Sequence, residues 1–393
     1  MSLPRNRLAF ALCALLLPFL LSGCWDIKSV QDVNYFTGIG VDFVDEQFVV
    51  YVQQLDFSSV AKTSGGEKSD KPSKSWVGRA TGKSLSEAIM KLYESAQQTV
   101  FWGHLNTVVL SENMLKSGRL LELFDAMLRS PEIRLTPWVF GTKENISDVF
   151  SSYAFFYLSP LNTILYAPES SYKQKSVVMP IRLYRFMKEF RDPGCTLLLP
   201  SLAIARDTWM VNRKPDPKLA FSGVYAIREE KFRDWYSIDQ ILGLRWMNKA
   251  NRTSRLILQR EGRPLATLRV NRPRERLRLT VDDTGNVNAR FDVRIRASML
   301  ELWQPSDVAQ LEKAAAEQVR GEIEASMRES IRSRSDLFNI EHALYRKHYK
   351  LWDRLTRHGK IPFEYGRMPE IRVTVHLTDS GAYKLSRNLR THD

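Results

Sequence analysis

Hydrophobic and polar residues in the first third of the chain follow strand and helix patterns in turn. Short, mostly apolar runs predict buried strands at 37–43, 48–55, 76–80, 105–110 and 135–141. Ser84 and Glu87 have the spacing of a capping box, which predicts a helix from Ser84 to about Gln98. A second helix is predicted at 118–129. Because strands and helices alternate, this part should form a mixed α/β layer.

The middle of the chain has a weaker periodicity. Residues 144–195 are predicted to be mostly helix and loop, with the clearest helix at 182–190. Two strands are predicted after it, at 197–204 and 220–227. Ser237 and Gln240 repeat the capping-box spacing, which predicts a helix from Ser237 to about Ala250.

The last third begins with segments in which apolar residues alternate with arginine. This pattern is typical of antiparallel strands with one exposed face, and it predicts strands at 254–258, 265–270, 276–281 and 288–300. An apolar stripe at helical spacing predicts the longest helix at 306–333. A second helix at 336–357 and a strand at 371–377 follow it.

These patterns predict an α+β fold with three mixed α/β domains, of which the last combines an antiparallel sheet with long helices. We place the domains at residues 24–143, 144–250 and 251–393. Residues 58–75 are small or charged and almost free of apolar side chains, so we expect a mobile loop there.

The first 23 residues have the layout of a secretory signal peptide. Arg5 and Arg7 precede the apolar run 8–21, and small residues follow before Cys24. The run is shorter than the roughly 20 residues that a membrane-spanning helix needs, and it contains Pro18. A transmembrane anchor is therefore the weaker interpretation.

The segment Leu21-Ser22-Gly23-Cys24 resembles a lipobox, at which bacteria attach diacylglycerol to the cysteine. We therefore predict that residues 1–23 are removed and that Cys24 is the lipidation site of a lipoprotein. Acyl chains such as palmitate would hold the protein at a membrane, since each buried CH₂ contributes about 0.8 kcal/mol. The alternative is an ordinary cleavage site that happens to lie beside a cysteine.

Cysteine content and net charge limit which disulfides and partners the mature protein can have. With Cys13 in the signal peptide and Cys24 acylated, only Cys195 remains, so no intrachain disulfide can form. We expect Cys195 to be a small buried side chain rather than a reactive thiol. The formal net charge is +14. For an exported protein, this charge points to membrane lipid or wall polymer and excludes nucleic acid as a partner.

Residues 252–278 contain nine arginines and two glutamates. We interpret this segment as the solvent-exposed face of an antiparallel sheet. Contact with anionic headgroups or wall polymer is the alternative interpretation.

No catalytic or cofactor motif is visible. The chain lacks a phosphate-binding Gly-Lys-Ser/Thr loop, a Gly-x-Ser-x-Gly elbow and a His-Glu-x-x-His helix. Gly38 and Gly40 precede a strand rather than a helix, which argues against a dinucleotide site. His342 and His348 are six residues apart and do not share a helix face, so we predict no metal site. We expect no enzyme activity and no cofactor, and we expect His104 to be partly buried.

Four pairs of short motifs follow one another along nearly the whole chain. They are Gly23-Cys-Trp-Asp26 with Gly38-Ile-Gly-Val-Asp42, Phe101-Trp-Gly-His-Leu105 with Val108-Val-Leu-Ser-Glu112, Ser222-Gly-Val-Tyr-Ala-Ile227 with Leu242-Gly-Leu-Arg-Trp246, and Val373-Thr-Val-His-Leu377 with Gly381. In this order they resemble the Ger(x)C family, the lipoprotein C subunits of spore germinant receptors. The segment after Asp336 lacks glycines expected there, and Tyr349 stands in place of an expected proline.

The resemblance implies three mixed α/β domains and no enzyme activity. It implies a complex in the spore inner membrane with a membrane-embedded A subunit and a transporter-like B subunit, which small nutrients trigger. The protein would lie on the outer face of that membrane, held by the lipid on Cys24. We expect it to act in assembly and leave nutrient binding to other subunits.

Two other functions are alternatives to this one. A solute-binding lipoprotein of an uptake system would have paired lobes of parallel βαβ units, and the antiparallel, arginine-rich third domain argues against it. A wall-modifying enzyme would need a carboxylate pair or a metal cluster, and neither is visible in the sequence.

Overall fold

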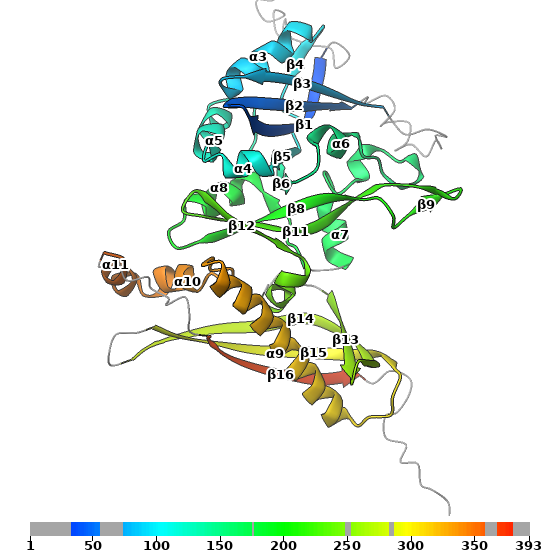
Figure 1. The fold of residues 1–393 in the computed structure, drawn as a ribbon, viewed down its shortest axis with the longest axis vertical. Coiled ribbons are helices and arrows are strands. Elements are labelled where there is room, and N and C mark those ends of the chain that lie inside the picture. The colour runs from blue at the N-terminus through cyan, green and yellow to red at the C-terminus, as the bar shows by residue number, and fades with distance from the viewer. Residues whose placement is uncertain are drawn as a thin grey trace, which may run out of the picture.

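The computed structural model describes residues 33–55, 74–174, 177–247, 253–282, 287–357 and 368–379. Two β-sheets lie one after the other along the long axis of the molecule (Figure 1). Cys24 lies outside the described residues, as do residues 58–73 of the predicted loop. Ser75 at the end of that loop is already the first residue of strand β3.

The first sheet has ten strands, eight of them in the order β12-β11-β8-β6-β5-β1-β2-β3, while β4 pairs with β1 and β7 with β6. Their bounds are β1 Val33–Val44, β2 Gln47–Leu55, β3 Ser75–Gly82, β4 Thr99–Phe101, β5 Thr107–Ser111, β6 Trp138–Thr142, β7 Ile181–Arg182, β8 Thr196–Ala205, β11 Lys218–Arg228 and β12 Lys231–Ser237. Strands β1, β5, β6 and β8 are parallel neighbours. This sheet runs across residue 143, where we placed a domain boundary, and the division into domains stays a prediction.

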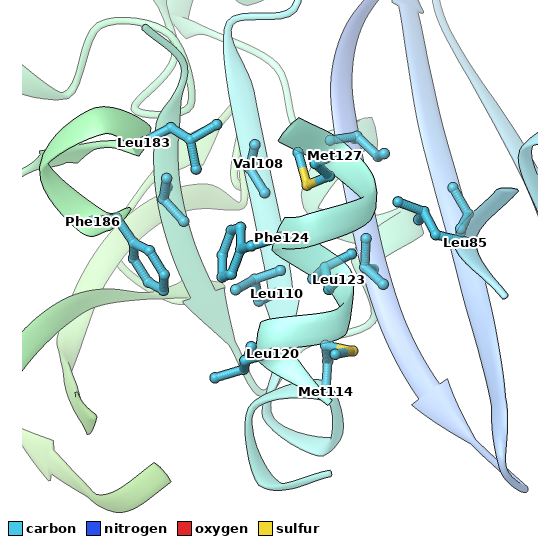
Figure 2. Close-up of a cluster of buried hydrophobic side chains, with 14 of the residues drawn as sticks. Leu85, Val108, Leu110, Met114, Leu120, Leu123, Phe124, Met127, Leu183 and Phe186 are labelled. Carbon is cyan, nitrogen blue, oxygen red and sulfur yellow. The ribbon is translucent and has the colours of Figure 1, made fainter. Parts of the chain in front are cut away.

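Helices cover both faces of the first sheet. Their bounds are α3 Leu85–Ser95, α4 Glu112–Lys116, α5 Leu120–Leu128, α6 Ile146–Ser151, α7 Pro168–Gln174 and α8 Leu183–Arg191, with 3₁₀ turns η2 Phe155–Tyr157 and η3 Pro160–Asn162. The predicted cap of α3 is present, because the Ser84 hydroxyl accepts a hydrogen bond from the Glu87 amide. Figure 2 shows α5 and α8 packing through Phe124 and Phe186 over the strand that carries Val108 and Leu110.

The second sheet has four strands in the order β13-β14-β15-β16. It is not the wholly antiparallel sheet that was predicted, because β16 runs parallel to β15. Their bounds are β13 Thr253–Arg260, β14 Arg263–Val281, β15 Val287–Leu302 and β16 Glu370–Asp379. Helix α9 (Val308–Arg332) covers one face, and its predicted apolar stripe is buried there from Leu311 to Met327. Two predicted strands, 265–270 and 276–281, are a single strand β14 whose register shifts between Asn271 and Arg274. Figure 1 shows α9 crossing this sheet diagonally.

Two of the predicted helices were wrong. The helix predicted to reach Ala250 is a 3₁₀ helix, η4, that ends at Trp246 (Asp239–Trp246). Strand β12 was not predicted, because three charged residues interrupt its apolar pattern. The helix predicted at 336–357 is two helices, α10 (Ile340–Lys347) and α11 (Tyr349–Arg357). They are separated at His348, which has non-helical backbone angles.

Candidate interaction surfaces

The N-terminal motif residues are needed for packing within the first sheet. A Cβ atom added to Gly40 would lie 2.3 Å from the Cγ2 atom of Ile146, so α6 can pack on β1 only because this residue is glycine. The Asp42 carboxylate accepts hydrogen bonds from the Ser111 hydroxyl and, at 2.8 Å, from the Phe43 amide. The role of these residues is therefore to stabilise the fold, and they do not indicate a binding site.

The motif around His104 combines a buried anchor with an exposed ring. Trp102 and Leu105 are buried, and the Trp102 indole donates a 2.6 Å hydrogen bond to the Tyr93 hydroxyl. His104 is exposed, so the expectation of partial burial was wrong. Its ring lies on the turn between β4 and β5, where it packs edge-on against Tyr35 at 4.9 Å.

The motif Leu242-Gly-Leu-Arg-Trp246 joins the two sheets. It forms most of η4, which lies against α9 (Figure 1). The Glu322 carboxylate of α9 accepts hydrogen bonds from the Arg245 guanidinium at 2.8 and 2.9 Å and from the Trp246 indole at 2.7 Å. Gly243 lies so close that an added Cβ would be 2.4 Å from the Glu322 carbonyl oxygen. This motif is therefore the joint between the first sheet and α9.

A second buried polar cluster holds α10 against the first sheet. Arg228 of β11 forms an ion pair with Glu341, which also accepts a 3.1 Å hydrogen bond from the Trp352 indole. The Asp336 carboxylate accepts a 2.7 Å hydrogen bond from the Glu341 amide. Burial raises the pKa of Asp336 to about 6, although its hydrogen bonds to backbone amides oppose this shift.

Asp336→Asn should remove a pH dependence of stability. The unfolded carboxyl has a pKa of 3.8 and the folded one about 6, so the folded state gains stability from the bound proton at low pH. That gain is lost as the pH rises from about 4 to 6, and its size is on the order of 3 kcal/mol. Asparagine keeps an acceptor for the Glu341 amide but cannot ionise. Urea unfolding at pH 4, 5, 6 and 7 should show wild type losing stability relative to the variant.

The exposed Asp207→Asn variant is the control for that measurement, since it should keep the wild-type pH dependence. If Asp336→Asn and wild type lose the same free energy of unfolding between pH 4 and pH 7, the buried carboxylate is not the titrating group.

The described residues contain few candidates for chemistry. Cys195 is buried, as predicted, and burial raises the pKa of its thiol to about 12, which keeps it protonated at neutral pH. The Nε2 atom of His342 lies 3.6 Å from the Asp192 carboxylate, and its Nδ1 atom donates a 3.2 Å hydrogen bond to the Pro193 carbonyl oxygen. Within the described ranges, no group of three or more metal-ligating side chains comes together.

Among the described helices, none is both long enough and apolar enough to cross a membrane.

A hairpin beyond the end of β8 carries an exposed apolar surface, which we call the hairpin patch. Its strands are β9 (Met210–Val211) and β10 (Lys214–Pro215), and Figure 1 shows it projecting from the side of the molecule. Trp209, Met210 and Val211 are all exposed, and the Trp209 ring packs on Phe155 of η2 at 4.8 Å. Next to it Phe156 is 88% exposed.

The backbone under the hairpin patch is well supported. Phe156 has a φ of 55°, in the left-handed region that a bulky residue rarely adopts. Beneath it, Tyr153 donates a 2.7 Å hydrogen bond to Asp216, which pairs with the buried Lys218 ammonium at 2.5 Å. That ammonium lies 5.1 Å from the centre of the Phe155 ring. An exposed group of aromatic side chains on strained backbone typically marks an interaction site.

Two protein-family models for spore germination proteins match this chain. The spore germination protein N-terminal domain matches residues 26–204, and the spore germination B3/GerAC-like C-terminal domain matches residues 222–380. The chain is 24% identical over 398 residues to spore germination protein KC of Bacillus subtilis (strain 168), covering 94% of each protein. It is 20% identical over 291 residues to spore germination protein B3 of the same strain, covering 73% of each.

A solved structure has the same fold. The crystal structure of the GerBC protein aligns with a TM-score of 0.55 at 13% identity, over 90% of this chain and 100% of that one. The α+β fold predicted from the sequence is thereby confirmed. The two matched models together span almost all of the chain after the first 25 residues. The chain therefore belongs to the Ger(x)C family, the C subunits of spore germinant receptors.

Proposed function

We propose that this protein is a non-catalytic, lipid-anchored receptor subunit, required for nutrient-triggered germination in complex with membrane A and B subunits. The observation that carries the proposal is the match to spore germination proteins over 26–204 and 222–380, directly after the lipobox cysteine Cys24. In this proposal the protein lies on the outer face of the spore inner membrane, and other subunits bind the nutrient.

The length of the tether limits how far the folded part can lie from the membrane. Strand β1 begins at Val33, nine residues after Cys24. An extended chain spans at most about 3.6 Å per residue, so Val33 would lie within about 32 Å of the lipid. Val33 pairs with Thr99 of β4, and the exposed rings of Phe101 and His104 follow it. This end of the molecule would therefore face the membrane.

Anchoring would also favour assembly with membrane subunits. A tethered protein meets partners in the same membrane at a high effective concentration, so a modest contact surface is enough to form a complex. The hairpin patch, with Trp209 exposed and the exposed Phe156 beside it, supports such a contact. The buried, protonated thiol of Cys195 supports the non-catalytic part of the proposal.

Cys24→Ala should separate the protein from the membrane or leave it as an unprocessed precursor. Spores that carry this variant should lose most of their response to the nutrients of this receptor and keep receptor-independent germination. Cys13→Ala is the matched control, because it removes a thiol from the signal peptide and should change neither processing nor germination. Membrane fractionation and germination assays on both variants provide the measurement.

Two results would contradict the proposal at different points. If the Cys24→Ala protein is processed and membrane-bound like wild type, Cys24 is not the anchor. If spores that lack the whole protein respond normally to every nutrient, it is not a required receptor subunit.

A further inference from the structure

Among the described residues, no helix covers one face of the second sheet. Alternate side chains of its strands, such as Leu268, Val293 and Ile295, form the core beneath α9. The side chains between them point to the opposite face. Nine of these are arginines: Arg255, Arg269, Arg274, Arg276, Arg278, Arg290, Arg294, Arg296 and Arg372. We call this surface the arginine face.

The registers of the four strands place these arginines side by side. Arg255 is opposite Arg269, Arg274 is opposite Arg294, and Arg278 is opposite Arg290. Neighbouring strands are about 4.8 Å apart, and alternate residues along one strand are about 7 Å apart. The guanidinium groups therefore form a two-dimensional array. Five of the nine lie within 252–278, and β15 and β16 contribute others that are distant in the sequence.

Carboxylates neutralise only part of this array. Asp292 pairs with Arg278 at 2.6 Å and lies 3.5 Å from Arg290, while Glu370 pairs with Arg372 at 2.6 Å. In the described part of the chain, the other arginines of the face have no carboxylate within ion-pair distance: Arg255, Arg269, Arg274, Arg276, Arg294 and Arg296. Glu301 lies at the far end of β15, where it accepts a hydrogen bond from Thr267.

Arg274 and Arg294 are the centre of the uncompensated charge. They are directly opposite each other on β14 and β15, and both are exposed. Arg276 and Arg296 flank them. Like charges directly opposite in a sheet are destabilising, so this arrangement weakens the fold unless an anion lies across the pair. A guanidinium binds phosphate through two parallel hydrogen bonds, and a row of them fits a chain of phosphates.

We propose that the arginine face binds an anionic polymer with repeated phosphate groups on the side of the protein away from the membrane. Charge complementarity supports the polymer, since a regular array of uncompensated cations matches repeated anions. Position argues against lipid headgroups. Figure 1 places β4, next to the start of β1, at one end of the long axis and the four-stranded sheet at the other.

This choice of polymer over bilayer rests on the proposed anchor at Cys24, which would hold the β4 end at the membrane. The presence of the arginine face does not depend on that anchor. A binding assay on the purified protein therefore tests the arginine face separately. The assay stays valid even if Cys24 proves not to be the anchor.

The experiment compares Arg274→Gln/Arg294→Gln with Arg320→Gln/Arg328→Gln. The control pair removes the same charge from exposed positions of α9, outside the arginine face. Long-chain polyphosphate is titrated into each protein at about 0.15 M salt, and phosphatidylglycerol vesicles are tested in parallel. The face variant should bind polyphosphate about tenfold more weakly than wild type, with a shallower dependence of affinity on salt. The control should bind like wild type.

Thermal unfolding with and without polyphosphate provides a second measurement on the same proteins. Polyphosphate should raise the melting temperature of wild type and control more than that of the face variant. Equal binding by both variants, or no binding by wild type, would overturn the proposal. A third result would also overturn the proposal of a polymer. If wild type binds vesicles but not polyphosphate, and the face variant loses vesicle binding, the arginine face binds a bilayer.

Discussion

Replacing Glu322 with alanine is expected to lower the free energy of unfolding by about 3 to 5 kcal/mol, the usual effect of removing one partner from a buried ion pair. Its carboxylate accepts hydrogen bonds from Arg245 and Trp246, both buried in the joint between η4 and α9. Alanine removes the acceptor of both donors at once. The guanidinium charge stays in a region that water reaches poorly, which is why the loss should be large.

Two variants make this expectation specific. Glu322→Gln keeps one acceptor oxygen and removes the charge, so its loss of stability should be intermediate. Glu317→Ala changes an exposed glutamate on the same helix and should alter stability by less than about 0.5 kcal/mol. Urea unfolding of the three proteins gives the comparison. A loss for Glu322→Ala as small as that for Glu317→Ala would show that the ion pair does not hold the joint.

Local patterns predicted most strands and helices because each has its own periodicity. The stripe of α9 from Leu311 to Met327 and the alternation in β13 and β14 depend on one element alone. Which strands pair with one another, by contrast, does not depend on one element alone. Nothing near Gly141 in β6 indicates that it lies beside Ser201 of β8, so the continuity of the first sheet past residue 143 was not predictable.

The segment after Ser237 shows how contacts between distant elements override a correct local signal. The predicted cap is present, since the Ser237 amide donates to the Gln240 side chain at 2.9 Å and the Gln240 amide lies 3.4 Å from the Ser237 hydroxyl. The element is nevertheless a short 3₁₀ helix that ends at Trp246. Its form is determined by close packing against α9, a helix that lies some 80 residues further along the chain.

The arginine face was only partly visible in the sequence. The nine arginines of 252–278 predicted an exposed sheet face, and those described on β13 and β14 are exposed. The uncompensated pair Arg274 and Arg294 depends on the register of β14 with β15, including a shift at Asn271. Hydrophobic alternation determines which face of the sheet a side chain is on. It does not determine which residue of the adjacent strand lies opposite.

Gly243→Ala should destabilise the same joint by about 3 kcal/mol, near the upper end for overpacking. The added Cβ would lie 2.4 Å from the Glu322 carbonyl oxygen and 2.6 Å from the Ile323 Cα atom. Both are backbone atoms of α9, so no side chain can rotate away and the two elements must separate. Separation would also weaken the 3.0 Å hydrogen bond from the Gly243 amide to the Ser326 hydroxyl.

Gly321→Ala is the matched control and should have the opposite sign. Gly321 lies two residues before Ile323 on α9, and an added Cβ there meets nothing within 4 Å. Alanine in an open helical position should stabilise the protein by about 0.5 to 1 kcal/mol. Thermal and urea unfolding should therefore move the two variants in opposite directions from wild type. If Gly243→Ala is as stable as Gly321→Ala, the close approach of η4 to α9 is not a feature of the folded protein.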